Sequence, residues 1–141
     1  MKQLMKLAAA AAAGAIASGT IVYAQAASQY PRAIVSLYRA APGQQEALLK
    51  WLADQDRVAK SVGIAPMQLY VHTDGDSWDY MGINPATTDA QDQAFDAAAK
   101  KMGVTNGPRA SLELRKYIAI HTDTMTVGPL TAEQALARYG S

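Results

Sequence analysis

Residues 67–84 read MQLYVHTDGDSWDYMGIN and contain two strand-like runs around a turn signal. The run Met67–Thr73 places apolar side chains at every second position, and Trp78–Asn84 also alternates with period two. Between them, Asp74–Ser77 begins with Asp-Gly, which is among the strongest short-range hairpin signals because both residues tolerate the backbone angles of a tight turn. The segment therefore predicts two antiparallel strands side by side.

The segment before this hairpin predicts a strand followed by a long helix. Arg32–Arg39 shows the alternation of a strand, and Pro42-Gly43 then breaks it. Apolar residues recur at helical spacing over residues 48–62, and the intervening positions are mostly polar. Gly63 supplies the signal that ends this helix.

The segment after the hairpin predicts a second helix with a defined start. Thr88 and Gln91 form a capping box, in which the hydroxyl and the amide satisfy backbone donors of the first turn. The helix is expected to run to Met102 and to end at Gly103.

Residues 108–121 fit both a helix and a strand, because their apolar side chains match either period. We favour the helix, since proline suits a first helical turn and the run is long for a strand. A fourth strand is then expected at Thr122–Val127, closed by Gly128-Pro129. A second capping box at Thr131–Gln134 opens a last short helix that stops at Gly140.

The predicted elements follow one another as β-α-β-β-α(α)-β-α over residues 32–141. This is the order of an α+β, ferredoxin-like βαββαβ domain with an extra helix and a short C-terminal helix. The length suits one ordinary domain with one hydrophobic core. The sequence therefore predicts a single ferredoxin-like domain.

The N-terminal segment has the three parts of a secretory signal peptide. Lys2 and Lys6 supply the positive charge, and an alanine-rich apolar run then extends to about Val22. Ala24 and Ala26 fit the small-residue pattern of a cleavage site, so removal of residues 1–26 is expected. The alternative is a retained membrane anchor, but the run is weakly apolar and shorter than the ~20 residues of a membrane span.

Cleavage would leave a short exported segment, residues 27–31, before the domain, and would place the protein in the periplasm or outside the cell. The formal charge of +1 becomes −1 without Lys2 and Lys6, so we expect neither nucleic acid nor, after signal cleavage, a membrane as a partner. The sequence contains no cysteine, which excludes disulfides and an acylated cysteine.

Two stretches carry a resemblance to a known group of proteins. One is the strand-Pro-Gly-helix start, from Leu37-Tyr38-Arg39 to Trp51, and the other is the hairpin from Tyr70-Val71-His72 to Trp78-Asp79-Tyr80. Together they resemble the dimeric α/β-barrel superfamily, which includes antibiotic-biosynthesis-type monooxygenases and NIPSNAP-like proteins. The resemblance covers Arg32 to about Gly128 and implies a homodimer in which two four-stranded sheets pack face to face.

The alternating patterns divide the predicted sheet into two faces. We expect the helices to cover an apolar set made of Val35, Leu37, Met67, Leu69, Val71, Met81 and Ile83. The opposite face would then carry Ile34, Ser36, Tyr38, Gln68, Tyr70, His72, Trp78 and Tyr80. An exposed aromatic patch marks an interface or a binding cleft. We therefore predict a homodimer through this face, with Tyr38, Tyr70, Trp78 and Tyr80 as candidate ligand-binding residues.

Two histidines and one aspartate are the candidates for catalysis. His72 and His121 can accept protons near neutral pH, and Asp123 lies two residues after His121. If the fourth strand joins the sheet as expected, the three could meet in one pocket, either as catalytic residues or as a metal site. The alternative is structural, with His72 bonding at an interface and Asp123 capping or turning the chain. No H-x-H or H-E-x-x-H spacing enforces a metal site, so metal and cofactor stay open.

Two function classes follow from these observations. The resemblance implies an enzyme similar to the cofactor-light monooxygenases, which would oxidise an aromatic or quinol-like compound with His72 or His121 as proton acceptor. It argues against a haem-degrading enzyme, because Ile34 and Ser36 stand where that branch has an asparagine. The alternative is a non-catalytic exported homodimer that binds a small ligand or has a structural role. No glycine-rich phosphate loop is present, so nucleotide cofactors are not expected.

Overall fold

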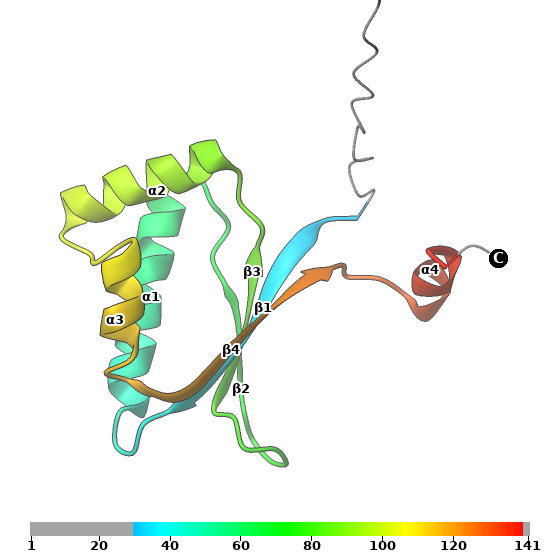
Figure 1. Ribbon diagram of the computed structural model, residues 1–141, viewed down its shortest axis with the longest axis horizontal. Coiled ribbons are helices and arrows are strands. Elements are labelled where there is room, and N and C mark those ends of the chain that lie inside the picture. Colours follow the sequence, from blue (N-terminus) through cyan, green and yellow to red (C-terminus); the bar gives the residue numbers. More distant parts are fainter. Residues whose placement is uncertain (1–29, 140–141) are drawn as a thin grey trace, which may run out of the picture.

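The computed structural model describes residues 30–139 of the chain. The predicted signal peptide with its cleavage site, most of the segment 27–31 and Gly140 lie outside the described residues. The elements, shown in Figure 1, are β1 (Arg32–Ala40), α1 (Gln45–Ser61), β2 (Gln68–Val71), β3 (Tyr80–Pro85), α2 (Asp89–Met102), α3 (Pro108–Leu114), β4 (Ile118–Val127) and α4 (Ala132–Ala137).

The four strands form one antiparallel sheet in the order β2-β3-β1-β4. Helices α1, α2 and α3 lie together on one face of the sheet, and α4 extends away from them beyond the end of β4 (Figure 1). We call these the helix-covered face and the open face, since no helix of the described chain covers the second. The expected α+β, ferredoxin-like domain is confirmed. No helix within residues 30–139 is long and apolar enough to cross a membrane.

Local signals explain where the helices begin and end. The Thr88 side chain accepts from the Gln91 backbone N–H while the Gln91 side chain bonds back to Thr88, so the predicted capping box of α2 is confirmed. Gly103 ends α2 in the left-handed conformation that glycine adopts at low cost. Thr131 forms the same box at the start of α4.

The structure resolves the ambiguity of residues 108–121 into two elements. The helix prediction is confirmed for α3 but wrong after Leu114, because residues 115–117 form a turn and the chain belongs to β4 from Ile118. Pairing with β1 explains the difference, because β1 supplies hydrogen-bond partners for Ile120 and His121. The fourth strand therefore starts earlier than Thr122 and carries His121 within it.

The predicted assignment of the two sheet faces is wrong for β1 and β3. It is confirmed for β2, where Leu69 and Val71 lie opposite Gly82 and Tyr80 and so face the helices. Tyr38 and Tyr80 are only 5% and 6% exposed and lie in the core under the helices, and Ser36 is buried beside them. They pack with Leu48 and Leu52 of α1. In β1 and β3 the helices therefore cover the side chains that were expected to be free, and Tyr38 and Tyr80 contribute large apolar surfaces to the core.

Tyr70 does not share a face with the other two tyrosines of the predicted patch. Residues directly opposite each other on paired strands point to the same side, and Tyr70 lies opposite Met81 whereas Tyr80 lies opposite Tyr38. Tyr70 therefore points away from the helices, as predicted, whereas Tyr38 and Tyr80 point toward them. Tyr70 belongs to the open face and is 49% exposed.

Candidate functional site

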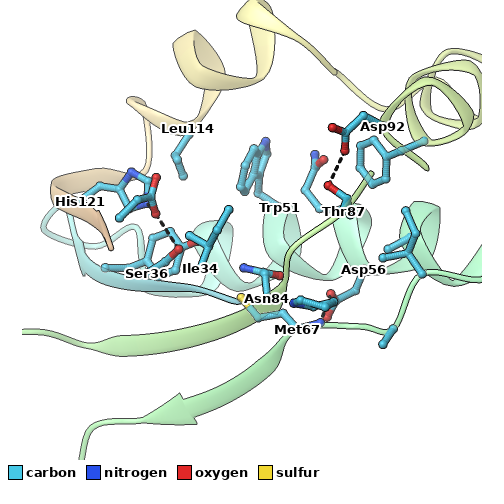
Figure 2. Close-up of a pocket in the computed structure, with 18 residues that line it drawn as sticks. Ile34, Ser36, Trp51, Asp56, Met67, Asn84, Thr87, Asp92, Leu114 and His121 are labelled. Carbon is cyan, nitrogen blue, oxygen red and sulfur yellow. Dashed lines mark hydrogen bonds and ion pairs between the residues drawn. The ribbon is translucent and has the colours of Figure 1, made fainter. Parts of the chain in front are cut away.

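A cavity of about 370 Å³ lies between the helix-covered face of the sheet and the helices above it (Figure 2). Eighteen residues line it, and they come from β1, α1, β3, α2, α3, β4 and the segments that connect them. Apolar side chains such as Ile34, Trp51, Phe95 and Leu114 form much of its wall. A volume of this size and an apolar lining with a few polar groups are typical of small-molecule sites.

Strand pairing brings four side chains together at one end of the cavity, which we call the histidine end. In the β1–β4 ladder Tyr38 lies opposite His121, and Ser36 lies opposite Asp123. The Ser36 hydroxyl donates a hydrogen bond of 2.6 Å to Oδ1 of Asp123. The Tyr38 and His121 rings stack with their centroids 4.7 Å apart and their planes 12° from parallel.

His121 lies beside a carboxylate and has a buried nitrogen without a hydrogen-bond partner in the described chain. Its Nε2 atom is 3.0 Å from Oδ1 of Asp123, yet the two are not aligned as a hydrogen bond, and this buried nitrogen has no hydrogen-bond partner among residues 30–139. Stacking on Tyr38 holds the plane of the ring. An imidazole placed this way can accept a proton from a ligand, because the neighbouring carboxylate stabilises the imidazolium that results.

Tyr38 stays protonated at the histidine end. Burial raises the pKa of the Tyr38 phenol above its ordinary value near 10, the Ser36 hydroxyl lowers it in part, and the carboxylates of Asp123 and Asp56 raise it further. The phenol is therefore a neutral, buried group that supports the His121 ring.

Trp51 is a functional candidate that the sequence pattern did not distinguish from an ordinary core residue. It lies on α1 and stands in the middle of the cavity, between Leu114 and Thr87 (Figure 2). Its Nε1 atom is buried and makes no hydrogen bond within the described part of the chain. A buried N–H without a partner costs free energy, so this indole is, within the described residues, an unsatisfied donor in the wall of the cavity.

Two further carboxylates line the cavity, Asp92 on the far side of Trp51 from His121 and Asp56 beside Met67 (Figure 2). Oδ1 of Asp56 accepts a hydrogen bond of 3.0 Å from the backbone N–H of Met67. Oδ1 of Asp92 accepts one of 2.5 Å from the Thr87 hydroxyl. These bonds hold both carboxylates in place against the wall of the cavity.

His72 and Trp78 lie outside this cavity, at the hairpin between β2 and β3. Their rings are in contact, with centroids 4.9 Å apart and planes tilted by 50°, and the His72 backbone N–H donates to the Asp79 carbonyl. Of the predicted catalytic residues, the structure brings His121 and Asp123 together and places His72 elsewhere. No group of three or more potential metal ligands occurs within residues 30–139.

The predicted ligand-binding residues are also separated. Tyr38 lines the cavity, whereas Tyr80 lies in the core, Tyr70 on the open face and Trp78 at the hairpin. Trp51 and Asn84 line the cavity without having been predicted. The helical spacing placed Trp51 on the apolar side of α1, but that signal is common to every core residue of the helix.

Comparison with solved structures identifies the fold. The protein PA3566 from Pseudomonas aeruginosa matches over 72% of this chain and 96% of its own, with 18% identity and a TM-score of 0.50. The likeness is one of fold alone. Weaker matches include a dimeric ferredoxin-like protein of unknown function from Thermobifida fusca, with 10% identity over 70% of this chain and 92% of its own and a TM-score of 0.46.

A protein from Chloroflexus aurantiacus, provisionally named an antibiotic biosynthesis monooxygenase, matches with 22% identity over 71% of this chain and 96% of its own, at a TM-score of 0.39. No protein family model matches the sequence, and no curated protein does. The chemistry of the site therefore has to be inferred from its own residues.

Proposed function

We propose that the protein binds a small hydroxylated aromatic compound in the cavity and oxidises it with dioxygen, as the cofactor-light monooxygenases that it resembles do. The observation that carries the proposal is the histidine end, where the buried Nε2 of His121 has no hydrogen-bond partner among the described residues and lies next to Asp123. The buried donor of Trp51 lines the same cavity. A flat ring would contact the apolar wall, and its oxygen would bond to these nitrogens.

The proposed reaction needs a proton acceptor and an oxidant. His121 takes the proton of the ligand, and Asp123 stabilises the charge on the imidazole. The electron-rich anion then transfers its electrons to dioxygen, which is the co-reactant. One oxygen atom replaces a ring hydrogen and becomes a quinone carbonyl, the phenolic oxygen becomes the other carbonyl, and the second oxygen atom leaves as water with the ring hydrogen and the phenolic proton.

Binding is tested with tryptophan fluorescence, because the two tryptophans occupy different places. Trp78→Phe leaves Trp51 as the reporter inside the cavity, and Trp51→Phe leaves Trp78 at the hairpin as the control. Titration with dihydroxynaphthalene under nitrogen should quench the first variant and leave the second nearly unchanged. Equal changes in both variants, or none in either, would contradict binding in the cavity.

Turnover is tested by oxygen uptake with the same compound, after subtraction of its rate without protein. His121→Gln keeps a planar polar group but cannot take the proton, so the rate should fall by about a hundred-fold. His72→Ala should have little effect, because His72 lies outside the cavity. A larger loss of oxygen-uptake rate in His72→Ala than in His121→Gln would indicate that the proton acceptor is at the hairpin instead. Binding without oxygen uptake would leave the non-catalytic ligand-binding function.

We propose that the protein forms a homodimer through the open face, in place of the aromatic face predicted from the sequence. Val35, Leu37, Met81 and Ile83 occupy the centre of this face, on the two inner strands, and Tyr70 lies beside them. An apolar sheet face that no helix of the described chain covers favours packing against a second copy. This partner would leave the cavity accessible, since the cavity lies on the other side of the sheet.

Sedimentation of the mature protein tests the dimer. Leu37→Asp introduces a charge into the centre of the proposed interface and should convert the dimer into monomers. Leu112→Asp is the matched control, because Leu112 is exposed on α3, on the opposite side of the sheet. A wild-type protein that sediments as a monomer would exclude this interface.

We also propose that the protein acts outside the cytosol after loss of residues 1–26. The support is the charge, apolar run and small-residue pattern of the N-terminal segment. Mass spectrometry of the protein from its native cells should show a chain that begins at Ala27. An intact N-terminus on protein that stays with the membrane would favour the anchor.

A further inference from the structure

We infer that the cavity selects positively charged aromatic compounds over negatively charged ones. This inference rests on the proposed binding function and specifies the charge class of its ligand. It follows from three features of the cavity: its carboxylates, the absence of cationic side chains from its lining, and the aromatic rings in its wall.

The lining of the cavity is acidic. Asp56, Asp92 and Asp123 are among its eighteen residues, and no lysine or arginine is. His121 is the lining side chain that can become positive, and Asp123 lies 3.0 Å from it. An anionic ligand would therefore meet three negative groups, and at most one positive charge that already has a partner.

Each carboxylate has one oxygen engaged and a second one available. Oδ1 of Asp123 accepts a hydrogen bond from the Ser36 hydroxyl, and Oδ1 of Asp56 accepts one from the Met67 backbone N–H. Oδ1 of Asp92 accepts one from the Thr87 hydroxyl. Their Oδ2 atoms have no hydrogen bond or ion pair within the described part of the chain. The carboxylates are thus oriented by the protein and can still accept hydrogen bonds from an ammonium group.

Carboxylates lie on both sides of Trp51 in the cavity. Figure 2 shows Asp92 on the far side of Trp51 from His121, and Asp56 beside Met67. A ligand ring over Trp51 would place an oxygen near the histidine end and an ammonium group near Asp92. The faces of Trp51 and Phe95 also attract cations, which adds to the preference.

Three compounds with the same ring system test the charge preference. Naphthylmethylamine is a cation at neutral pH, naphthylmethanol is neutral and naphthoate is an anion. Calorimetric titration at low salt should give the cation about ten-fold tighter binding than the neutral compound, and the anion about ten-fold weaker binding. Added salt should reduce the difference, because ions screen charges that remain accessible to solvent.

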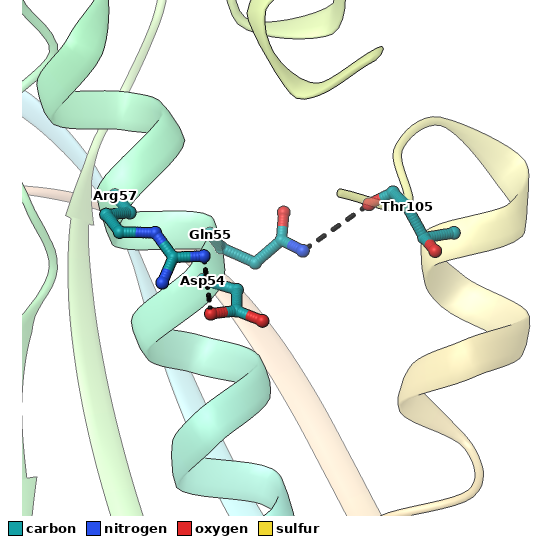
Figure 3. Close-up of polar contacts among 4 residues, drawn as sticks. All are labelled: Asp54, Gln55, Arg57 and Thr105. Carbon is teal, nitrogen blue, oxygen red and sulfur yellow. Dashed lines mark hydrogen bonds and ion pairs between the residues drawn. The ribbon is translucent and has the colours of Figure 1, made fainter. Parts of the chain in front are cut away.

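Two neighbouring aspartates provide a matched pair of variants on α1. Asp56→Asn removes a charge from the cavity and keeps an oxygen that can accept from Met67. Asp54→Asn removes a charge two residues away, where Asp54 pairs with the exposed Arg57 at 2.9 Å (Figure 3). Asp56→Asn and Asp92→Asn should each reduce the preference for the cation several-fold, whereas Asp54→Asn should leave it unchanged.

The outcomes separate this inference from the proposed function. If the three compounds bind equally, or naphthoate binds most tightly, the charge preference is refuted while the binding cavity stands. A preference for the cation that Asp54→Asn reduces as much as Asp56→Asn would attribute it to the whole surface and would also refute the inference. If none of the three binds, the proposed binding function fails and the inference fails with it.

Discussion

A methyl group added at Gly82 tests how closely the sheet packs against the cavity wall. Gly82 is buried in β3 opposite Ser36. A Cβ atom built there would overlap Sδ of Met67 and lie 3.1 Å from its Cγ. Gly82→Ala therefore forces the Met67 side chain to move, and Met67 lines the cavity.

The expected cost combines two opposing effects. Overpacking by one methyl group costs about 1–3 kcal/mol, and the lower value applies when the displaced side chain is flexible, as methionine is. Alanine in a strand also gains roughly 0.5–1 kcal/mol over glycine, because it restricts the unfolded chain. The two effects nearly cancel, so we expect a net loss of at most about 0.5 kcal/mol in the free energy of unfolding, together with weaker binding of the naphthalene compounds.

A double-mutant cycle measured by urea unfolding isolates the steric overlap between a methyl group at position 82 and the Met67 side chain. The variants are Gly82→Ala, Met67→Ala and the two combined. Because Met67→Ala removes the atoms that the new methyl group meets, the double variant should be more stable than the sum of the single losses predicts, by about 1 kcal/mol. Losses that add to within roughly 0.5 kcal/mol would refute the close contact between Gly82 and Met67.

Three further predictions concern stability. Burial raises the folded-state pKa of Tyr38, so its neutral phenol stabilises the fold fully at pH values below the unfolded-state pKa near 10. This stabilisation is lost as the pH rises from there toward the folded-state pKa. Between about pH 8 and pH 11, the free energy of unfolding measured with urea should therefore fall less in Tyr38→Phe than in the wild type. Tyr139→Phe is the control at an exposed tyrosine, and its free energy of unfolding should fall as in the wild type. Leu48 is fully buried, so Leu48→Ala should lower the free energy of unfolding by about 2–5 kcal/mol. Leu136 is 69% exposed, so Leu136→Ala should lower it by less than about 0.5 kcal/mol. Similar losses in the two variants would contradict the placement of Leu48 in the core. Thr88→Ala should cost about 1 kcal/mol and lower the helix content seen by circular dichroism, and an unchanged melting temperature would exclude a stabilising cap at α2.

Local chemistry made several elements predictable. The capping residues of α2, the Asp-Gly turn and the glycine that ends α2 act within a few residues of chain, so their effects can be read without knowing the fold. The element order followed from these signals and from the hydrophobic periods. That order was sufficient for the ferredoxin-like domain, because few sheet topologies accommodate it.

The start of β4 could not be obtained in the same way. Ile118 and Ile120 suit a helix or a strand, and β1 resolves the choice by providing paired backbone groups about 80 residues earlier in the chain. Only with β4 in place does His121 stack on Tyr38 and approach Asp123. The proposed proton acceptor thus depends on a contact between segments that are distant in sequence.

The sequence by itself determined that these strands and helices exist, their order and, within β1, the division of side chains into two alternating sets, but not where α3 ends and β4 begins. It also carried His121 and Asp123 as candidates for catalysis. Tertiary structure alone established that the helices cover the set containing Tyr38, that Tyr70 points to the other side, and that Trp51 and His121 share a cavity. The physical reason is that a period of two defines two faces without distinguishing them. Which face is buried depends on the total apolar surface that packs against the helices, and this is a property of the whole domain.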